Sequence, residues 1–538
     1  MRSASWSMKW VPWLAGLLLL AMRMLWLGAY PLDSDEPQHA HVAWSLATGA
    51  LPYRGAFDNH GPLFGLLYSY CMRWLGPRTD ILWWLRLAVV PWYVLALLST
   101  WVMGRRLYPL AVAGAGALLA ALMQIFFVKM GEFRTDDLWT ALWLAALAVI
   151  VGRHRSLWRG FVAGLCIGAA LSVSQKTLPL LATALVSGLA VGLGRPVKRP
   201  DLPRLVAATA AGVALMPLAV VAWLAWQRDL GTAYYDVVAY GLAPNGGPSH
   251  LWRQVLYALV AACLVGATVL RLRGRRELDD ASRWKWFLGL QALLYVLLIW
   301  VAWPLSTPQD FLPVIPTAML SLAGALGPAA VPRLGPRRCA ASVAALAMLE
   351  LALLLHHAPP WRDALAAERS RLAVVLRCTA PSDPVMDAKS GAIFRPRPYY
   401  PVLESIELRR LKHGLVPDTI AHALVSHDTK VVVPERLPPA DRAFVARNYL
   451  AGTAGIYMAG MVLPAGTDPR ISIELPGAYA LSDGTHLVQA RMDGGPPATQ
   501  WNLDAGPHRL AAPGQRDLFL VWSPAWACGW RPAPGRHP

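Results

Sequence analysis

The sequence predicts a polytopic α-helical membrane protein, with about eleven transmembrane helices followed by a soluble C-terminal region that combines an α/β part and a β part. Of its 538 residues, 56% are hydrophobic and only 15% are charged, which is too apolar for an ordinary soluble enzyme of this length. Apolar stretches long enough to cross a bilayer recur up to residue 357. Lysine and arginine, which give a net charge of +18, gather in alternate loops. That pattern is typical of membrane proteins and argues against a nucleic-acid partner.

The expected spans follow one another along a transmembrane domain of residues 1–358. The first could be mistaken for a signal peptide, but Arg23 lies near its far end and no small-residue cleavage site follows, so we expect it to be retained as a helix. The predicted spans cover residues 10–28, 81–103, 109–128, 137–152, 159–175, 177–194, 204–226, 254–270, 285–304, 310–328 and 339–357.

The basic loops predict how the chain is oriented in the membrane. By the positive-inside rule, the side on which they gather is cytoplasmic. The N-terminus is then cytoplasmic and the region after residue 358 lies outside. A composition rich in Arg, Ala and Trp suggests a GC-rich bacterial genome, so we expect a protein of the bacterial inner membrane with this region in the periplasm. The basic connections are residues 104–108, 152–159, 194–204, 271–285 and 332–338.

The loop between the first two spans, residues 29–80, is too long to be a simple connector. Within it, residues 36–49 have the pattern of a short amphipathic helix, and residues 62–76 that of an apolar helix too short to cross the bilayer comfortably. We expect both helices to lie along the outer surface of the membrane. Loops of this length often carry function.

Beyond residue 359 the chain becomes rich in Pro, Gly and charged residues, which predicts a soluble region. Its first part, residues 359–465, mixes strands with helical stretches such as 404–415, and residues 466–538 have the pattern of a small β-rich unit. Cys378 and Cys528 lie in this region, and their spacing leaves open whether they form a disulfide. Strand-like runs occur at residues 372–376, 430–434, 471–475, 486–492 and 517–522.

Carboxylates gather directly after the first span, at Asp33, Asp35 and Glu36. Carboxylates at the outer face of a membrane can act as a general base, bind a divalent cation, or simply begin a solvated helix, and all three alternatives stay open. The i, i+2 spacing of His39 and His41 puts them on different faces of a helix, which disfavours a zinc site held by that pair. The same loop also carries Asp58, Asn59 and His60.

Two shorter outward connections also carry charges at the membrane boundary. Capping of the next helix explains one acid in the connection 129–139 but not the whole set, because charges so near hydrocarbon are costly unless paired or wet. In the turn 174–176, Lys176 can either anchor the chain at lipid phosphates or hold the phosphate of a lipid-linked substrate. The charged residues of the first connection are Lys129, Glu132, Arg134, Asp136 and Asp137.

The three outward segments place acids and phosphate-seeking cations on one face of the predicted bundle. Transfer of a sugar from a lipid phosphate requires a carboxylate that takes the proton of the acceptor hydroxyl, and cations that stabilise the departing phosphate. Because phosphate is already a competent leaving group, a second carboxylic acid is dispensable, in contrast to glycoside hydrolysis. The sequence therefore favours a glycosyltransferase.

Residues 33–63 resemble the first outward loop of GT-C glycosyltransferases, in particular bacterial members similar to protein O-mannosyltransferases and to the lipid A aminoarabinose transferase. The resemblance implies a GT-C-like fold, with Asp35 as the catalytic base and Glu36 beside it. The motifs that carry it are D-S-D-E at 33–36, A-x-x-L-x-x-G at 43–49, P-Y at 52–53 and D-N-H-G-P-L at 58–63.

Weaker motifs extend the resemblance over roughly residues 10–330. R-T-D-D resembles the family's second acidic turn and implies Asp136, with Asp137 as an ambiguous neighbour. S-Q-K resembles the turn whose lysine, here Lys176, approaches the lipid phosphate, and Arg134 is expected to assist it. The segment 306–316 departs from the family pattern because Asp310 stands where a basic residue is frequent, which argues against a phosphate contact there.

The resemblance also implies an inverting transferase with an undecaprenyl-phosphate-type donor. The acceptor stays open among a lipid, a glycan and a protein, and so does assistance by a divalent cation; no other cofactor is expected. Tyr240 lies in the aromatic outward loop 234–252, which suits a sugar face, a prenyl chain or an interfacial aromatic belt. The expected substrate contacts are Asp33, Asp58, His60, Asp137 and Tyr240.

A transporter or flippase for a lipid-linked or acidic solute is the main alternative from another class. Transporters usually show paired half-repeats and charges near the midplane of the bilayer. Here the charges are expected at the outer ends of the helices, and no repeat is visible. An anchored carbohydrate-binding protein, with the tail as its binding module, would leave the charged first loop unexplained.

Overall fold

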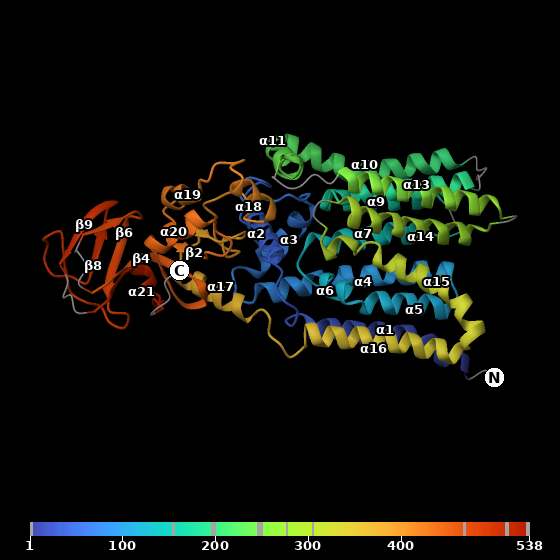
Figure 1. Cartoon of the computed structure of the whole chain (residues 1–538), viewed down its shortest axis with the longest axis horizontal. Coiled ribbons are helices and arrows are strands. Elements are labelled where there is room, and N and C mark those ends of the chain that lie inside the picture. Colours follow the sequence, from blue (N-terminus) through green and yellow to red (C-terminus); the bar gives the residue numbers. More distant parts are fainter. Residues whose placement is uncertain are drawn as a thin grey trace.

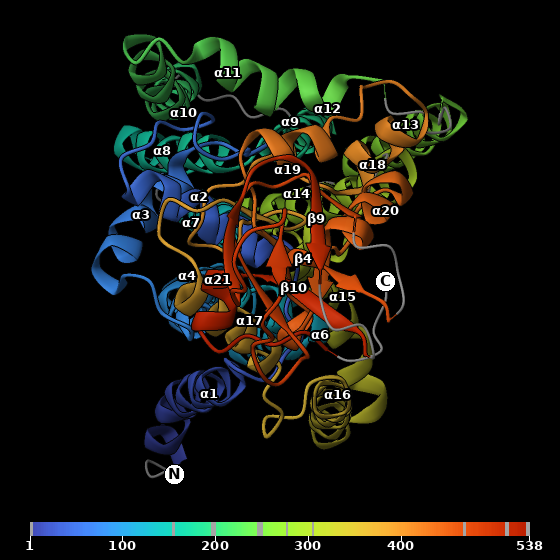
Figure 2. The ribbon, with the colours of Figure 1, turned by 90° about the vertical axis from the view of Figure 1, so that its left-hand side faces the viewer.

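The computed structural model describes residues 4–152, 156–194, 201–244, 251–275, 278–303, 306–465, 470–511 and 516–533, with side chains from residue 12 onward. The first two thirds of the chain form a bundle of long helices, and the C-terminal region packs against one end of it (Figure 1). Viewed from that end, the C-terminal strands lie over the middle of the bundle (Figure 2).

The helices of the bundle make this a multi-pass membrane protein. Within the described residues, seven helices are long and apolar enough to cross a membrane, namely α4, α9, α10, α13, α14 with the π-helical η2 (Leu298–Ala302) that continues it, α15 and α16. The bundle consists of α1 (Ala4–Trp26), α4 (Ile81–Leu107), α5 (Leu110–Leu122), α7 (Thr135–Ile150), α8 (Leu157–Val173), α9 (Thr177–Gly194), α10 (Leu202–Trp226), α13 (Leu251–Arg273), α14 (Asp280–Leu297), α15 (Ile315–Leu334) and α16 (Pro336–His357).

Each predicted span overlaps one of these helices, with two larger differences. The span predicted at 109–128 is broken after α5, because Met123 is extended (φ −51°, ψ 121°) and a short helix, α6 (Gln124–Lys129), follows. The helix predicted from residue 310 begins at Ile315, because η3 (Pro308–Phe311) forms a 3-10 turn instead. Both irregular segments lie at the end of the bundle that faces the C-terminal region (Figure 1).

Close helix packing depends on small residues. On α8, a Cβ atom added to Gly164 would lie 2.1 Å from the carbonyl oxygen of Thr209 on α10, so only glycine fits at this contact. By contrast, α10, α13 and α16 keep most of their apolar windows exposed within the chain. Such surfaces are expected to face lipid.

The two helices predicted in the first loop are present as α2 (Asp35–Ala47) and α3 (Leu63–Leu75). They lie where the bundle meets the C-terminal region (Figure 1). Although α2 was expected along the outer surface, most of its side chains are buried, because α3, α4 and the C-terminal region pack against it. His41, for example, lies with Nδ1 3.0 Å from the carbonyl oxygen of Ile393.

A further short helical segment flanks the same end of the bundle. It runs through α11 (Leu230–Tyr234), the π-helical η1 (Tyr235–Ala239) and α12 (Tyr240–Leu242). The remainder of the predicted aromatic loop, residues 245–250, lies outside the described residues.

The C-terminal region is built on a mixed sheet of strand order β1-β2-β4-β10-β6-β8, with β3 paired to β4, and a second sheet of order β5-β9-β7. Because β4 pairs antiparallel with β10, the larger sheet joins strands from before and after residue 465. The strands are β1 (Val385–Met386), β2 (Val431–Val432), β3 (Tyr449–Ala451), β4 (Tyr457–Leu463), β5 (Arg470–Ile473), β6 (Gly477–Ser482), β7 (Arg491–Met492), β8 (Gln500–Leu503), β9 (Gly506–Ala511) and β10 (Leu518–Trp522). The helices are α17 (Ala366–Cys378), α18 (Ser405–Lys412), α19 (Ile420–Ser426), α20 (Pro439–Asn448) and α21 (Ser523–Ala527).

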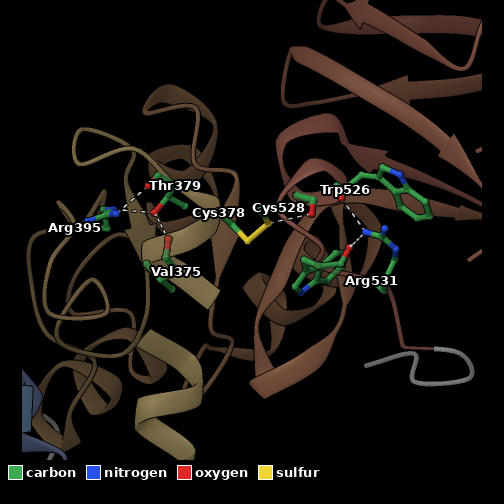
Figure 3. The surroundings of a disulfide bond; sticks show 9 residues. Val375, Cys378, Thr379, Arg395, Trp526, Cys528 and Arg531 are labelled. Atoms are coloured by element: carbon green, nitrogen blue, oxygen red, sulfur yellow. Dashed lines mark hydrogen bonds between the residues drawn. A yellow bond between two sulfur atoms is a disulfide. The ribbon is translucent and has the colours of Figure 1, made fainter. Parts of the chain in front are cut away.

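Most of the strand-like runs in the tail overlap strands, namely β2, β5, β7 and β10, but the strand predicted at 372–376 is wrong. Those residues belong to α17, where Leu372, Val374 and Val375 are buried, and a short apolar run fits a buried helix as well as a strand. At the end of α17, Cys378 forms a disulfide with Cys528, with Cα atoms 5.3 Å apart (Figure 3). The pairing that the sequence left open is therefore present.

Candidate active site

Three segments far apart in sequence meet at the end of the bundle that faces the C-terminal region. They are the start of α2 with Asp33 and Asp35, the start of α7 with Arg134 and Asp136, and the turn between α8 and α9 with Lys176. Both helices begin with acids, whose negative charge is favourable at a helix N-terminus. The sequence predicted that these segments would converge, and they do.

Arg134 is the centre of this charged network. Its side chain is 4% exposed, and its guanidinium lies 2.6 Å from Asp33, 2.7 Å from Asp35 and 3.2 Å from Asp136. Asp33 is also 2.9 Å from the amine of Lys129. A buried guanidinium that forms ion pairs with several carboxylates holds them close together, because each buried charge needs an opposite charge nearby.

Lys176 continues the network on the far side of Asp136. Its Nζ lies 3.3 Å from Oδ1 of Asp136 and 2.7 Å from Oδ1 of Asp310. The second oxygen of Asp310 accepts the backbone N–H of Thr307 at 2.8 Å, which fixes the 3-10 turn η3. The segment 306–316 therefore supplies a partner for Lys176. Through Arg134 and Asp136, the candidate base and the candidate phosphate-binding lysine belong to one continuous cluster.

Glu36 has surroundings different from those of its neighbour Asp35. Its carboxylate receives two hydrogen bonds from the guanidinium of Arg86, at 2.6 and 2.7 Å, and both side chains are fully buried. It also accepts the backbone N–H groups of Asp33 and Phe133, at 3.1 and 3.0 Å. Glu36 thus ties the first loop to α4 and to the second charged turn.

The loop before α3 packs directly against the turn that carries Lys176. The N–H of Gly61 donates to the carbonyl oxygen of Val173 at 3.0 Å, and a Cβ atom added to Gly61 would lie 2.0 Å from the carbonyl oxygen of Ser172. This contact brings Asp58 and His60 to the charged end of the bundle, where Nδ1 of His60 lies 2.9 Å from Oδ1 of Asp58.

The other two predicted site residues lie away from the centre of the network. Asp137 is fully buried, and neither of its carboxylate oxygens has a hydrogen-bond partner within the described part of the chain. Tyr240 is buried against Phe57, with ring centroids 4.7 Å apart, and Tyr400 of the C-terminal region packs on the same Phe57 ring. Tyr240 is therefore part of an aromatic contact between the first loop, α12 and the C-terminal region.

The C-terminal region supplies one more cation to the network. Nζ of Lys389 contacts Oδ1 of Asp35 and lies 3.3 Å from Glu404. Asp387 fixes the loop that carries this lysine, because its carboxylate accepts the backbone N–H groups of residues 389–392 at 2.5–2.9 Å. Asp35 is therefore held between a cation of the bundle and a cation of the C-terminal region.

These contacts determine the protonation of the two central groups. Burial alone would raise the pKa of Asp35, but Arg134 and Lys389 hold it well below its usual range. Burial opposes the charge on Lys176, yet Asp136 and Asp310 raise its pKa. Asp35 is therefore an ionised carboxylate, still 25% exposed, and Lys176 is a cation. The pair can accept a proton and stabilise an anion in the same cluster.

The sequence did not reveal the contributions of Lys389 and Glu404. Lys389 is 354 positions from Asp35, and a lysine in a soluble tail carries no local signal of a role at the membrane. Asp310 did carry a sequence signal, because it stands at a position where the resemblance led us to expect a basic residue. Its pairing with Lys176 explains how an acid is accommodated at that position.

No protein-family model and no curated protein matches the sequence, but solved structures match the fold. ArnT from Cupriavidus metallidurans in the apo state aligns with a TM-score of 0.56 over 84% of this chain and 96% of that chain, at 14% identity. The same protein bound to undecaprenyl phosphate aligns with a TM-score of 0.54 over 83% and 95% of the two chains, again at 14% identity. An oligosaccharyltransferase from Archaeoglobus fulgidus aligns with a TM-score of 0.44 over 83% and 73%, at 12% identity. The chain thus shares the fold of ArnT, in agreement with the fold that its first loop implied.

Proposed function

We propose that this protein is a membrane glycosyltransferase that moves a sugar from a polyprenyl-phosphate donor to an acceptor at the periplasmic face of the bacterial inner membrane. The observation that carries this proposal is the continuous network from Asp35 through Arg134 and Asp136 to Lys176. The fold supports it, since ArnT, which shares this fold, binds undecaprenyl phosphate.

In the proposed reaction, Asp35 is the general base. Its ionised carboxylate takes the proton of the acceptor hydroxyl as that oxygen attacks the anomeric carbon. The bond between the anomeric carbon and the phosphate oxygen breaks, and the phosphate leaves with the electron pair. Because the base acts on an acceptor opposite the leaving group, the anomeric configuration inverts. Arg134 keeps Asp35 aimed at the acceptor.

The cations of the cluster act on the other side of the sugar. Lys176, assisted by Arg134, stabilises the charge of the departing lipid phosphate. Asp136 positions both cations, since it contacts both. For the phosphate of the donor to bind Lys176, the ion pair between Lys176 and Asp310 must weaken. Asp310 therefore occupies, in the absence of donor, the position on Lys176 that the phosphate would take.

The remaining residues position or border the site. Glu36 anchors the first loop through Arg86, and Asp33 orients Arg134. Substrate contacts are assigned to residues near the mouth of the site and to one acid inside the bundle: Asp58, His60, Tyr240 and Asp137.

Two observations support the proposed orientation. Among the described residues, Arg105 and Arg106 lie in the last turn of α4 and Arg333 in the last turn of α15, at the ends of these helices away from the network, as expected of a cytoplasmic side. The disulfide between Cys378 and Cys528 is typical of an oxidising compartment. Together they favour a cytoplasmic N-terminus and a periplasmic C-terminal region.

Transport of a lipid-linked or acidic solute fits these observations less well. A transporter places its charges near the midplane, between moving halves, whereas this network lies at one end of the bundle and is covered by the C-terminal region. The acceptor class, whether lipid, glycan or protein, is left to experiment.

The test compares the lipids, glycans and proteins of the cell envelope by mass spectrometry, with and without this protein. Wild type should add one sugar to one envelope component, and Asp35→Asn should abolish that addition while leaving membrane insertion intact, because the amide cannot accept the proton. Asp80→Asn is a matched control, since Asp80 lies in the same loop but pairs with Arg78 at the surface. Normal sugar addition by Asp35→Asn would remove Asp35 from the mechanism.

A further inference from the structure

His39, Asp58 and His60 form a second cluster beside the charged network, in which Asp58 and His60 are also proposed substrate contacts. One potential ligand atom from each of the three side chains lies within 4.8 Å of the others. His39 comes from the second turn of α2, while Asp58 and His60 come from the loop that the Gly61 contact fixes against α8. The cluster therefore joins two separately positioned elements.

We infer that His39, Asp58 and His60 form a binding site for a zinc ion. Two imidazole nitrogens and one carboxylate oxygen are a donor set that suits zinc, which takes nitrogen and oxygen ligands in a tetrahedral arrangement. Three protein ligands leave a fourth position for a water molecule or a substrate oxygen. This site differs from the pair of His39 and His41 that the sequence spacing disfavoured, because its second histidine comes from the loop and not from the same helix.

The state of His39 is the strongest argument for a bound ion. His39 is 2% exposed, and its Nε2 has no hydrogen-bond partner among the described residues. A buried ring nitrogen without a partner costs free energy, which coordination to an ion would recover.

A simpler explanation covers only part of the cluster. His60 and Asp58 form an ordinary pair, with Nδ1 of His60 2.9 Å from Oδ1 of Asp58, and the same oxygen accepts the backbone N–H of His60 at 3.0 Å. That pair accounts for two of the three side chains without an ion. It does not account for His39, whose ring centroid lies 5.0 Å from that of His60.

The position of the cluster gives an ion access to the charged network. Asp35 and His39 are four residues apart on α2, so they lie on the same face of the helix. An ion held by His39 would therefore lie beside the proposed base without replacing it. The inference goes beyond the proposed transfer and stands or fails separately from it.

The helix also provides a matched control. His41 is as buried as His39, at 2% exposure, but its Nδ1 lies 3.0 Å from the carbonyl oxygen of Ile393 in the C-terminal region. Removing His41 should thus disturb packing to a similar degree without removing a ligand.

The experiment measures zinc in the full-length protein, purified in detergent through a tag without histidines, exposed to zinc and desalted. Wild type and His41→Gln should each retain about one zinc per chain. His39→Ala and Asp58→Asn should each lower the affinity at least about tenfold. Zinc should raise the melting temperature of wild type but not of Asp58→Asn. Because Asn has nearly the same size as Asp, this variant removes a ligand without changing the packing, and it keeps the test valid if His39→Ala does not fold.

Two further results separate the possible outcomes. X-ray absorption of the zinc-loaded protein should show imidazole ligands at about 2.0 Å, and Asp35→Asn should retain zinc even where it loses transfer. Equal zinc retention by wild type and His39→Ala, or no retention by wild type, would overturn the inference. Either result would leave the proposed transferase untouched.

Discussion

At the residue scale, the neighbours Asp35 and Glu36 show how position divides two similar side chains between different roles. Asp35 is 25% exposed and bonded to cations from two domains, whereas Glu36 is fully buried on Arg86. The resemblance implied Asp35 as the base with Glu36 beside it, but the sequence did not show what holds Glu36. The difference depends on Arg86, 50 positions away, and on backbone N–H groups that no motif reveals.

Replacing Glu36 by Gln should destabilise the protein far more than replacing Asp35 by Asn. The Gln variant leaves the buried guanidinium of Arg86 without a counter-charge, which costs about 3–5 kcal/mol. Unfolding of each variant in mild detergent, followed by tryptophan fluorescence, measures the difference. Combining Glu36→Gln with Arg86→Met should recover part of the loss, because the second change removes the unpaired charge. Equal stability of the two single variants would contradict the assigned roles.

At the scale of elements, the loop 387–392 links the soluble region to the chemistry. The carboxylate of Asp387 fixes this loop by accepting hydrogen bonds from the backbone N–H groups of the loop. The loop places Lys389 in contact with Asp35. A lysine held in this way lowers the pKa of a neighbouring carboxylate. The C-terminal region therefore contributes directly to the state of the proposed base.

Lys389→Ala should shift the acid limb of the pH profile of kcat/KM upward by about one pH unit. With Lys389 present, the pKa of Asp35 is depressed, so activity that needs the ionised carboxylate persists above that low pKa and is lost only as pH falls through it. Without the lysine, the pKa rises toward its usual value and the loss begins at higher pH. An unchanged acid limb would show that Arg134 alone sets the pKa of Asp35.

Lys430→Ala is a suitable control for this measurement. Lys430 belongs to the same C-terminal region and also pairs with an aspartate, Asp428, at 2.5 Å. Within the described part of the chain, Lys430 does not contact Asp35. Its removal should leave the pH profile of kcat/KM unchanged.

Elements with a strong periodic signal were predictable, and those decided by tertiary contacts were not. The long apolar runs gave the helices of the bundle, but the break at Met123 and the 3-10 turn at 308–311 were missed, because apolar composition alone does not show where a helix is interrupted. The run at 372–376 was assigned to a strand, since buried helices and buried strands share short apolar sequences. The burial of α2 depends on a region more than 300 residues later.

At the scale of the whole molecule, the charged network explains why distant segments had to be considered together. Asp35, Arg134, Asp136 and Lys176 were identified in the sequence as separate turns, and alternation of basic loops was enough to place them on one face. Their connection through a chain of ion pairs required the fold. Lys389 and Asp310 complete the network from segments that carried little or no functional signal.

The bond between Cys378 and Cys528 has a practical consequence for the topology of the chain. It closes a loop of 150 residues that contains Lys389, so cleaving it changes the migration of the chain in a denaturing gel. A reductant that cannot cross membranes, added to intact spheroplasts, should produce this change if the tail is outside. If only permeabilised spheroplasts respond, the tail faces the interior. A single covalent link thus reports the sidedness of the whole polypeptide.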